Sequence, residues 1–465
     1  MRRSLVHRLT SLAAIGVVLT TGAIVAPATA APVTAAPTTI APVAAAPDNR
    51  PSTTRNGYLK VGYFTQWGIY GRAFTVKKLN DSGAAARLTH LNYAFGNVSP
   101  DGRCYVDGGP GEGDPWADYQ RPVPAQESVD GVADAWGEPL NGNFGQLQKL
   151  KALHPDLRVL ISLGGWSWST HFSDAARTPQ SRRDFVASCI DLYIRGNLPN
   201  PDGSAGGPGS LAGVFDGIDL DWEWPGSAGD VDTVFRPEDK QNFTALVAEF
   251  RRQLDAVGRA DRRHYQLTAF VPANPAAIDA GFEVPKVFRN LDFATVQSYD
   301  FHGGWETVAN QQSALRVPAG ATEPAYAVDR TINAWIDRGA ARGKLVLGVP
   351  YYGRGWTGVT GGRNGLFGTS TGPAPATYEA GYEDYKVLRS KVGQDGYRVY
   401  RDLRAGTAWL YDGTTFWTYD DPAVLLQKAL YIRTERLGGA MIWSLDGDDD
   451  RATLTRTLDL GLWTP

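Results

Sequence analysis

The sequence predicts an α/β fold, a (β/α)8 TIM barrel with a small α+β insertion between its seventh and eighth strands. Eight short apolar runs recur along residues 57–465, separated by stretches long enough for a helix. One of these stretches, 241–256, has apolar residues at the helical spacing i, i+3, i+4, i+7 and i+11. Strands that alternate with helices pair in parallel, and no dinucleotide-binding glycine fingerprint follows the first run, which favours a closed barrel over an open sheet.

Most of the expected strands carry β-branched or aromatic residues, and Gly, Pro or Asn lies close to each end. In chain order they are 59–67, 88–96, 157–166, 215–225, 265–274, 293–301, 344–353 and 439–448. Two connections, about 99–143 and 357–417, are too long to be simple loops. In the second, 397–403 and 408–421 read as short antiparallel strands with an Asp-Gly turn. Insertions at the carboxyl ends of barrel strands build the walls of binding clefts.

The N-terminus has the features of a secretory signal peptide over residues 1–30. Arg2, Arg3 and Arg8 precede an apolar run over 12–25, and small residues follow at 28–30. A membrane anchor is the alternative, but the run is shorter than the ~20 residues that a spanning helix needs. Residues 31–56 are rich in Ala, Pro and Thr and read as a linker to a catalytic barrel over 57–465. We therefore expect a secreted, extracellular protein that is not bound to a membrane.

Composition excludes several classes of protein. With 43% hydrophobic and 20% charged residues in 465, the chain is an ordinary globular protein, and its net charge of −3 gives no footprint for nucleic acid. Cys104 and Cys189 could form a disulfide or remain two buried thiols. The six His lack metal-site spacing. We expect a monomer without metal or cofactor.

The segment FDGIDLDWEWP over 215–225 carries the chemistry. Because side chains alternate along a strand, Asp219, Asp221 and Glu223 share one face, about 6.6 Å apart in succession, while Ile218 and Leu220 point to the other. Three acids inside a barrel repel one another, so at least one should keep its proton, as a general acid requires. An acidic edge strand would not interleave its acids with Ile, Leu and Trp. A calcium loop needs Gly at its sixth position and Glu at its twelfth, which this segment lacks.

The chain resembles the glycoside hydrolase family 18 chitinases from about Gly57 to its end. DGIDLDWEWP matches the family signature D-x-x-D-x-D-x-E, SLGG (162–165) matches a second signature, and SYD (298–300) and Trp443 match two further positions. YYGRGWTGV (351–359) and the insertion behind it resemble bacterial chitinases with an α+β insertion.

This resemblance implies a role for each matching residue. Glu223 would protonate the glycosidic oxygen and then act as a base towards water. Asp221 would hold and charge-stabilise the substrate acetamido group, and Asp219 would tune that pair. The nucleophile would be the N-acetyl carbonyl oxygen of the substrate, giving an oxazolinium intermediate and net retention. Tyr299 would hydrogen-bond the acetamido carbonyl, Asp300 would hold the distorted sugar, and Trp443 would form the floor.

Further residues are expected near the substrate. Gln297 replaces a Met found in many relatives and could contact substrate through its amide. Ser162 is expected to support Asp219 through its hydroxyl, while Gly164 and Gly165 allow close backbone approach. Flat aromatic rings suit the apolar faces of sugars. The aromatic residues expected to line the cleft, beside Trp443, are Tyr63, Trp166, Trp305, Tyr352 and Tyr385.

The predicted function is that of a secreted endo-chitinase that hydrolyses β-1,4 linkages between N-acetylglucosamine residues of chitin and chitooligosaccharides. One alternative is an endo-β-N-acetylglucosaminidase acting on N-glycans, but the insertion favours a groove for a linear polymer. Another is a chitin-binding lectin, against which the presence of Glu223 argues. Endo and exo cleavage are both compatible with the sequence.

Overall fold

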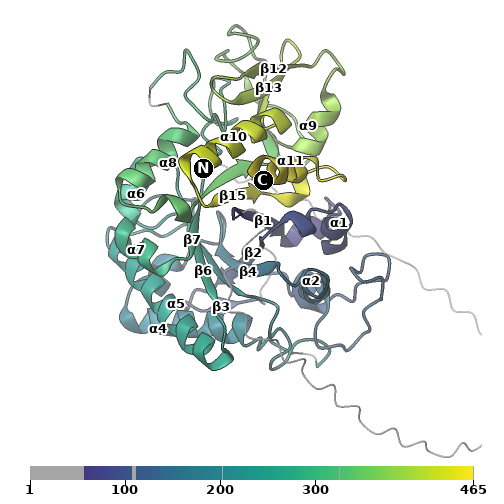
Figure 1. The fold of residues 1–465 in the computed structure, drawn as a ribbon, viewed down its shortest axis with the longest axis vertical. Coiled ribbons are helices and arrows are strands. Elements are labelled where there is room, and N and C mark those ends of the chain that lie inside the picture. Colours follow the sequence, from purple (N-terminus) through teal and green to yellow (C-terminus); the bar gives the residue numbers. More distant parts are fainter. Residues whose placement is uncertain (1–56, 107–111, 202, 324, 464–465) are drawn as a thin grey trace, which may run out of the picture. The chain divides into compact units, whose positions relative to one another are not determined.

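Eight parallel strands close into a barrel in the computed structural model, which describes residues 57–106, 112–201, 203–323 and 325–463. Pairing of β1 with both β2 and β15 closes the ring and confirms the predicted barrel (Figure 1). The expected signal peptide (1–30) and linker (31–56) lie outside the described residues. The barrel strands are β1 (Leu59–Thr65), β2 (His90–Val98), β4 (Arg158–Gly164), β5 (Gly217–Asp221), β6 (Gln266–Val271), β7 (Phe293–Val296), β8 (Leu345–Pro350) and β15 (Gly439–Trp443).

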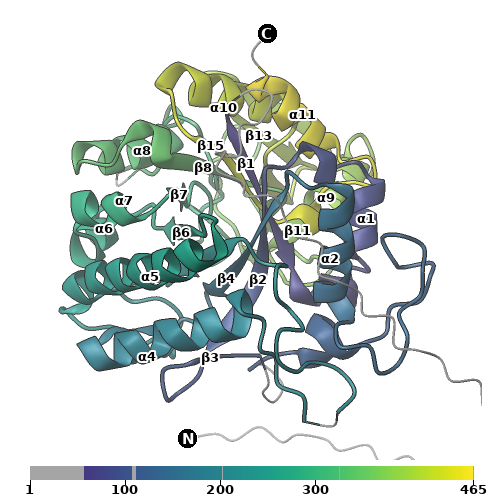
Figure 2. The ribbon, with the colours of Figure 1, turned by 60° about the horizontal axis from the view of Figure 1, so that its bottom comes forward.

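Helices lie outside the barrel strands, and Figure 2 shows α4, α5, α7 and α8 stacked along one side of them. The apolar face predicted over 241–256 lies within α5, whose Phe243, Leu246 and Phe250 are buried. The helices of this layer are α1 (Val76–Asp81), α2 (Gly142–Leu153), α3 (Phe172–Ala176), α4 (Pro179–Cys189), α5 (Asp239–Asp261), α6 (Pro275–Gly281), α7 (Val284–Asn290), α8 (Val328–Asp337), α10 (Pro422–Glu435) and α11 (Thr453–Leu462).

The alternation of side chains along the barrel strands divides the apolar core around these strands into two clusters. Ile218 and Leu220 of β5 belong to the outer cluster, which packs between the strands and the helices. Tyr63, Phe270 and Met441 belong to a separate inner cluster inside the barrel. The acids that alternate with Ile218 and Leu220 therefore point to the barrel interior.

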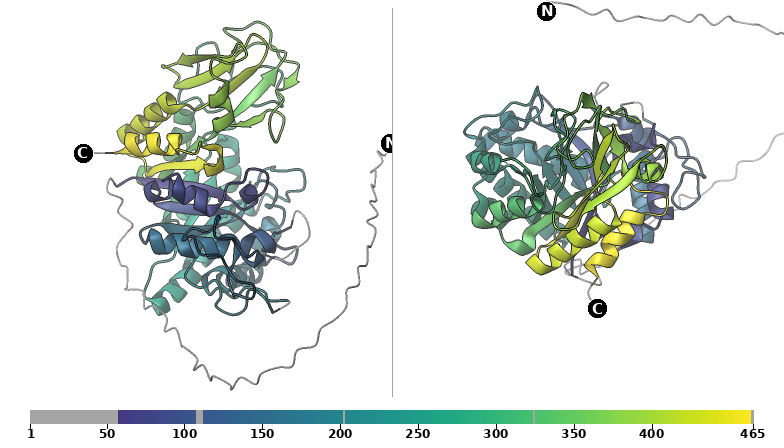
Figure 3. Two further views of the ribbon diagram at one scale, coloured as in Figure 1. Left: turned by 90° about the vertical axis from the view of Figure 1, so that its right-hand side faces the viewer. Right: turned by 90° about the horizontal axis from the view of Figure 1, so that it is seen from above.

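The insertion after β8 forms a second, antiparallel sheet, as predicted (Figure 3). Its strands run in the order β10-β9-β14-β13-β12. In addition, β11 pairs with residues 352–354 of β9. The sheet begins at Tyr352, ahead of the expected residue 357, because β8 ends at Pro350 and the chain turns at once into β9. Its elements are β9 (Tyr352–Thr357), β10 (Gly372–Pro373), β11 (Tyr382–Asp384), α9 (Tyr385–Lys391), β12 (Arg398–Asp402), β13 (Thr407–Tyr411) and β14 (Phe416–Tyr419).

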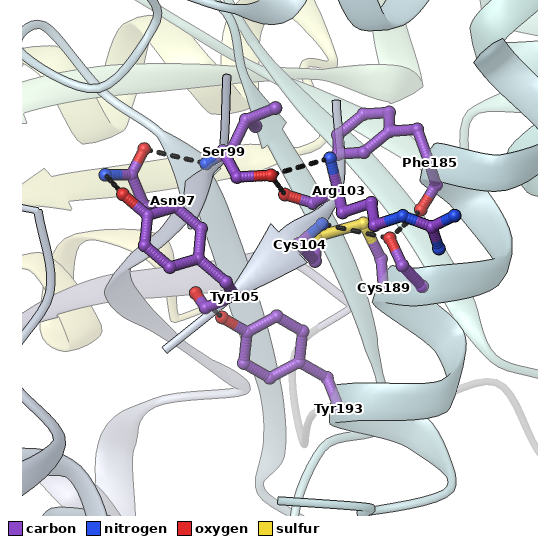
Figure 4. The surroundings of a disulfide bond; sticks show 10 residues. Asn97, Ser99, Arg103, Cys104, Tyr105, Phe185, Cys189 and Tyr193 are labelled. Carbon is purple, nitrogen blue, oxygen red and sulfur yellow. Dashed lines mark hydrogen bonds between the residues drawn. A yellow bond between two sulfur atoms is a disulfide. The ribbon is translucent and has the colours of Figure 1, made fainter. Parts of the chain in front are cut away.

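A disulfide joins Cys104 to Cys189, which decides between the two possibilities that the sequence leaves open (Figure 4). Cys104 lies in β3 (Cys104–Tyr105), a short strand that pairs antiparallel with the end of β2, and Cys189 ends α4. The backbone N–H of Cys104 also donates to the Ser188 hydroxyl at 2.9 Å. The loop that follows β2 is thereby tied to the helical layer.

No helix among the described residues is both long enough and apolar enough to cross a membrane.

Candidate active site

Three buried carboxyl groups lie at the carboxyl end of β5. Asp219 and Asp221 belong to the strand, and Glu223 follows two residues after its end; at most 9% of each residue is exposed. Parallel pairing places Asp219 between Ser162 of β4 and Thr268 of β6. The alternation expected from the sequence thus brings the three acids together inside the barrel.

Asp219 is held by hydroxyl groups from three other strands of the barrel, the adjacent β4 and β6 and the more distant β1. Its Oδ2 accepts hydrogen bonds from Tyr63 Oη at 2.7 Å and Ser162 Oγ at 2.8 Å, and its Oδ1 accepts one from the Thr268 hydroxyl. Burial raises the pKa of Asp219, while these hydrogen bonds to the charged form lower it. The arrangement fixes the orientation of the carboxyl group, and Ser162 occupies the supporting position expected for it.

Asp221 and Glu223 form a pair in which the protonated form is favoured. Burial first, and then the charges of Glu223 and Asp219, raise the pKa of Asp221 well above its ordinary value. Burial and the charge of Asp300 raise the pKa of Glu223 to about 8, although its hydrogen bond with Asp221 lowers it. The pair therefore keeps a proton at neutral pH.

Asp221 also has a free hydrogen-bonding position. Its Oδ1 is buried and accepts no hydrogen bond from any described residue. A buried oxygen of this kind costs free energy unless a partner reaches it. A donor on a bound molecule, such as an amide N–H, would satisfy it.

The loop after β4 fixes the backbone that carries Asp221 and Glu223. Ser169 Oγ accepts the Glu223 N–H at 2.8 Å and donates to the Gly165 carbonyl at 2.8 Å, while the Gly165 N–H donates to the Asp221 carbonyl at 2.8 Å. Gly164 has φ +105°, and a Cβ there would lie 2.3 Å from the Asp221 carbonyl oxygen. Only glycine therefore fits at 164. Sequence reasoning missed Ser169, for which no local signal exists.

Asp300 lies near enough to Glu223 for its charge to raise the Glu223 pKa, and it is anchored by the insertion. Its carboxylate accepts bonds from Tyr352 Oη at 2.8 Å and from Arg354 Nε and Nη2 at 2.8 and 2.9 Å. Both partners belong to β9. Asp300 itself has φ +57°, which turns the chain sharply after β7. Arg354 was not expected from the sequence, because only the fold brings β9 against residue 300.

Tyr299 is buried beside all of these acids. Burial first, then the charges of Asp300, Asp221 and Glu223, raise the pKa of its hydroxyl well above the ordinary value. The phenol is therefore protonated throughout the physiological range and is able to donate a hydrogen bond. The hydroxyl makes a weak contact with Met441 Sδ at 3.9 Å.

Three of the tryptophans expected to line the cleft lie at or after the ends of barrel strands. Trp443 is half-buried, stacks on Phe95 at 5.7 Å between ring centroids, and meets Tyr63 edge-on at 5.3 Å. Trp305 is 60% exposed, with the Arg354 guanidinium 5.1 Å from its ring centroid. Trp166, which lies in the loop after β4, is 50% exposed. Exposed indole rings of this kind provide flat apolar surface with little entropy cost.

Two expected residues lie elsewhere or have other partners. Tyr385 is the first residue of α9 and packs in the outer core near Tyr419, with ring centroids 6.4 Å apart. Tyr382, three residues earlier on β11, instead stacks on Tyr352 at 4.2 Å. Gln297 is half-buried, and its Oε1 accepts the Ala273 N–H at 3.3 Å. Its amide is thus partly occupied by the backbone that follows β6.

Within the described parts of the chain, no cluster of three or more His, Cys, Asp or Glu side chains is arranged to hold a metal ion.

Comparison with known proteins gives one family. The model of "Glycosyl hydrolases family 18" matches residues 60–448. Chitinase 63 of Streptomyces plicatus is 38% identical over 418 residues, which cover 89% of this chain and 62% of that protein. Chitinase A1 of Niallia circulans is 34% identical, with 89% and 60% covered. The chain thus spans about three fifths of the length of these relatives.

The solved structures agree with the sequence matches. The catalytic domain of psychrophilic chitinase B from Arthrobacter TAD20 superposes with a TM-score of 0.83 at 45% identity, covering 88% of this chain and 96% of that one. Chitinase ChiA74 from Bacillus thuringiensis gives 0.75 at 32% identity, covering 87% of this chain and 70% of that one. The family model covers most of the chain, including the strand that bears the three acids, and the chain therefore belongs to glycosyl hydrolases family 18.

Proposed function

We propose that this protein is a chitinase that cleaves β-1,4 linkages between N-acetylglucosamine residues with retention of configuration. The observation that carries the proposal is the buried Asp221–Glu223 pair, in which Glu223 keeps its proton at neutral pH while Asp221 presents a buried oxygen without a partner. A protonated carboxyl is a general acid, and an unpartnered carboxyl oxygen accepts an amide N–H. A 2-acetamido sugar supplies that amide beside the bond to be cleaved.

The mechanism follows from these two groups. Glu223 donates its proton to the glycosidic oxygen as the bond to the anomeric carbon breaks. Asp221 accepts the acetamido N–H and stabilises the positive charge that develops when the acetamido carbonyl oxygen attacks the anomeric carbon. Tyr299 donates to that carbonyl oxygen and orients it. Glu223, now ionised, takes a proton from the water that opens the oxazolinium ring and restores the configuration.

The surroundings support a polymeric substrate. Trp443 provides an apolar floor, and Trp166 and Trp305 present exposed indole faces beyond it. These rings suit the C–H faces of successive sugars, and the relatives named above are chitinases. We propose endo-cleavage of chitin and chitooligosaccharides by a single chain, because one chain supplies every group of the site.

We also propose that the protein is secreted. The basic, apolar and small-residue segments of residues 1–30 and the Cys104–Cys189 disulfide both suit export to an oxidising compartment.

Replacement of Glu223 by Gln tests the proposal. Glu223→Gln preserves size and hydrogen bonding but carries no transferable proton, so we expect hydrolysis of chitin hexamer to fall by about 10³-fold while oligosaccharide binding persists. Hydrolysis is followed by product chromatography and binding by calorimetry. The matched control is Glu323→Gln, at a surface side chain that pairs with Arg330 and accepts the Ala325 N–H.

The products themselves test the remaining features. Freshly released ends should be β-anomers by NMR, and a high-mannose glycopeptide should be left intact. Release of α-anomers, or full activity of Glu223→Gln, would contradict the mechanism.

A further inference from the structure

A buried group of charges joins the insertion to the barrel. Arg72 follows the short helix η1 (Gln66–Ile69) after β1, Asp384 ends β11, and Asp446 lies in η6 (Leu445–Gly447) after β15. We call these three residues the Arg72 junction. The side chains of Asp384 and Asp446 are only 1% and 2% exposed, and that of Arg72 is 13% exposed.

Arg72 contacts both carboxylates at once. Its Nη1 donates to both oxygens of Asp384, and its Nε lies 3.1 Å from Asp446 Oδ2. Tyr378 covers the guanidinium, with the ring centroid 4.2 Å from Cζ, and donates its hydroxyl to the Gly71 carbonyl at 3.0 Å. The planar guanidinium, which presents several donors in fixed directions, suits this double pairing better than an ammonium group.

The junction continues directly into the active site on the side of the insertion. Tyr382, two residues before Asp384 on β11, stacks on Tyr352 with centroids 4.2 Å apart. Tyr352 donates to Asp300, and the charge of Asp300 raises the pKa of Glu223. A shift of β11 therefore reaches Glu223 through two packed rings and one hydrogen bond.

The Arg72 junction also continues into the active site on the side of the barrel. Asp446 accepts a hydrogen bond from the hydroxyl of Ser444, the residue after Trp443. Arg72 thus ties β11, which pairs with the strand β9 that holds Asp300, to the loop that follows Trp443.

We infer that Arg72 is a positioning residue for the reaction, which holds the insertion against the barrel so that Tyr352 and Asp300 stay beside Glu223. The inference rests on the proposed function, because it assigns Arg72 a role in the chemistry of the same site. Arg72 touches neither the acids of β5 nor Asp300, and it acts only through the contacts above.

Removal of Arg72 leaves two buried carboxylates close together. The groups that face them are Lys386, whose Nζ lies 3.3 Å from Asp384 Oδ2 and donates to the Asp446 carbonyl at 2.6 Å, and the phenol of Tyr382. Lys386 is partly exposed and reaches one carboxylate only. Without Arg72 the two acids repel when ionised and push β11 away from the barrel.

The test is the pH profile of Arg72→Met. We expect kcat/KM on chitin hexamer to fall by about tenfold near pH 8, and the basic limb of the profile to move to lower pH by about half a unit, because Asp300 no longer lies as close to Glu223. Arg72→Lys keeps the positive charge but not the planar guanidinium. It should therefore show a smaller fall in kcat/KM and a smaller shift of the basic limb.

A second pair of variants separates positioning from stability. Arg72→Met/Asp384→Asn removes the repulsion but still lacks the contacts of Arg72 that tie β11 to η6, so its thermal midpoint should recover while part of the shift of the basic limb remains. Arg338→Met removes an arginine that donates two hydrogen bonds to Asp279 on the outer surface. This variant should leave the pH profile unchanged.

The inference is overturned if the folded Arg72 variants keep the kcat/KM and basic limb of the unmodified protein. That result is distinct from a failure of the proposed function, which would appear as full activity of Glu223→Gln.

Discussion

Asp219 and Glu223 are four residues apart but have opposite surroundings. Three hydroxyl groups donate to Asp219, which stabilises its charged form against the cost of burial. The Glu223 carboxyl is buried and lies near Asp300, and burial and the charge of Asp300 both favour its protonated form. One strand therefore presents one carboxyl group with a fixed orientation and another that keeps its proton.

The pKa of Glu223 predicts how activity depends on pH. Because that pKa is about 8 and the protonated form is the acid, kcat/KM should fall as the pH rises through about 8. Asp300→Asn removes a negative charge that raises this pKa, so the basic limb should move to lower pH, in addition to any loss of rate. The profile is measured with chitin hexamer between pH 5 and 9.5.

A surface carboxyl provides the control for that experiment. Asp395 lies in an exposed turn of the insertion, and Asp395→Asn should leave the basic limb in place. If the basic limb of Asp300→Asn stayed at the pH of the unmodified protein, a group other than Glu223 beside Asp300 would govern that limb.

At the scale of strands and helices, local patterns identified most of the barrel. The alternation along 215–225 predicted that the acids face inwards, and the helical spacing over 241–256 lies within α5. The insertion was harder, because β9 pairs with β11 and β14, which lie some 30 and 65 residues further along the chain. No local pattern reports such pairings, so the stacking of Tyr382 on Tyr352 and the contacts of Arg354 and Arg72 were missed.

The close approach of the β4 loop to β5 gives a prediction for stability. Gly164→Ala places a methyl group 2.3 Å from the Asp221 carbonyl oxygen, at φ +105°. Backbone strain and overpacking should lower the free energy of unfolding by about 2 kcal/mol or more and should also impair hydrolysis. Urea unfolding followed by tryptophan fluorescence measures the change.

Gly343→Ala is the matched substitution. Its added methyl group would meet no atom within 4 Å, and its φ is not positive. We expect its unfolding midpoint to stay within error of the unmodified protein. Equal destabilisation by both substitutions would mean that loss of glycine, not the contact with Asp221, is responsible.

At the scale of the whole molecule, several buried acids link stability to pH. Burial raises the pKa of Asp118 to about 7 and that of Asp448 to about 6, beside Glu223 at about 8. The folded chain therefore holds protons that the unfolded chain releases near pH 4, so the free energy of unfolding falls as pH rises through these folded-state values. Burial lowers the pKa of His90 to about 4, which has the opposite effect on stability. This effect, a rise in the free energy of unfolding with pH, is confined to pH values below the ordinary His pKa of 6.5. Between pH 6.5 and 8.5, the acids dominate.

Asp118 offers the clearest test, because it lies outside the active site. It is 2% exposed, its Oδ1 accepts hydrogen bonds from Gln66 Nε2 at 2.6 Å and from the Tyr93 hydroxyl, and the nearby charge of Asp114 adds to the effect of burial. An amide oxygen can accept the same two bonds without ionising, so Asp118→Asn should keep the fold. We expect the thermal midpoint of the unmodified protein to fall from pH 6.5 to 8.5, and that of Asp118→Asn to fall less over the same range. If the two midpoints fell in parallel, Asp118 would not be a source of the pH dependence, and the buried pair at Asp221 and Glu223 would have to account for it.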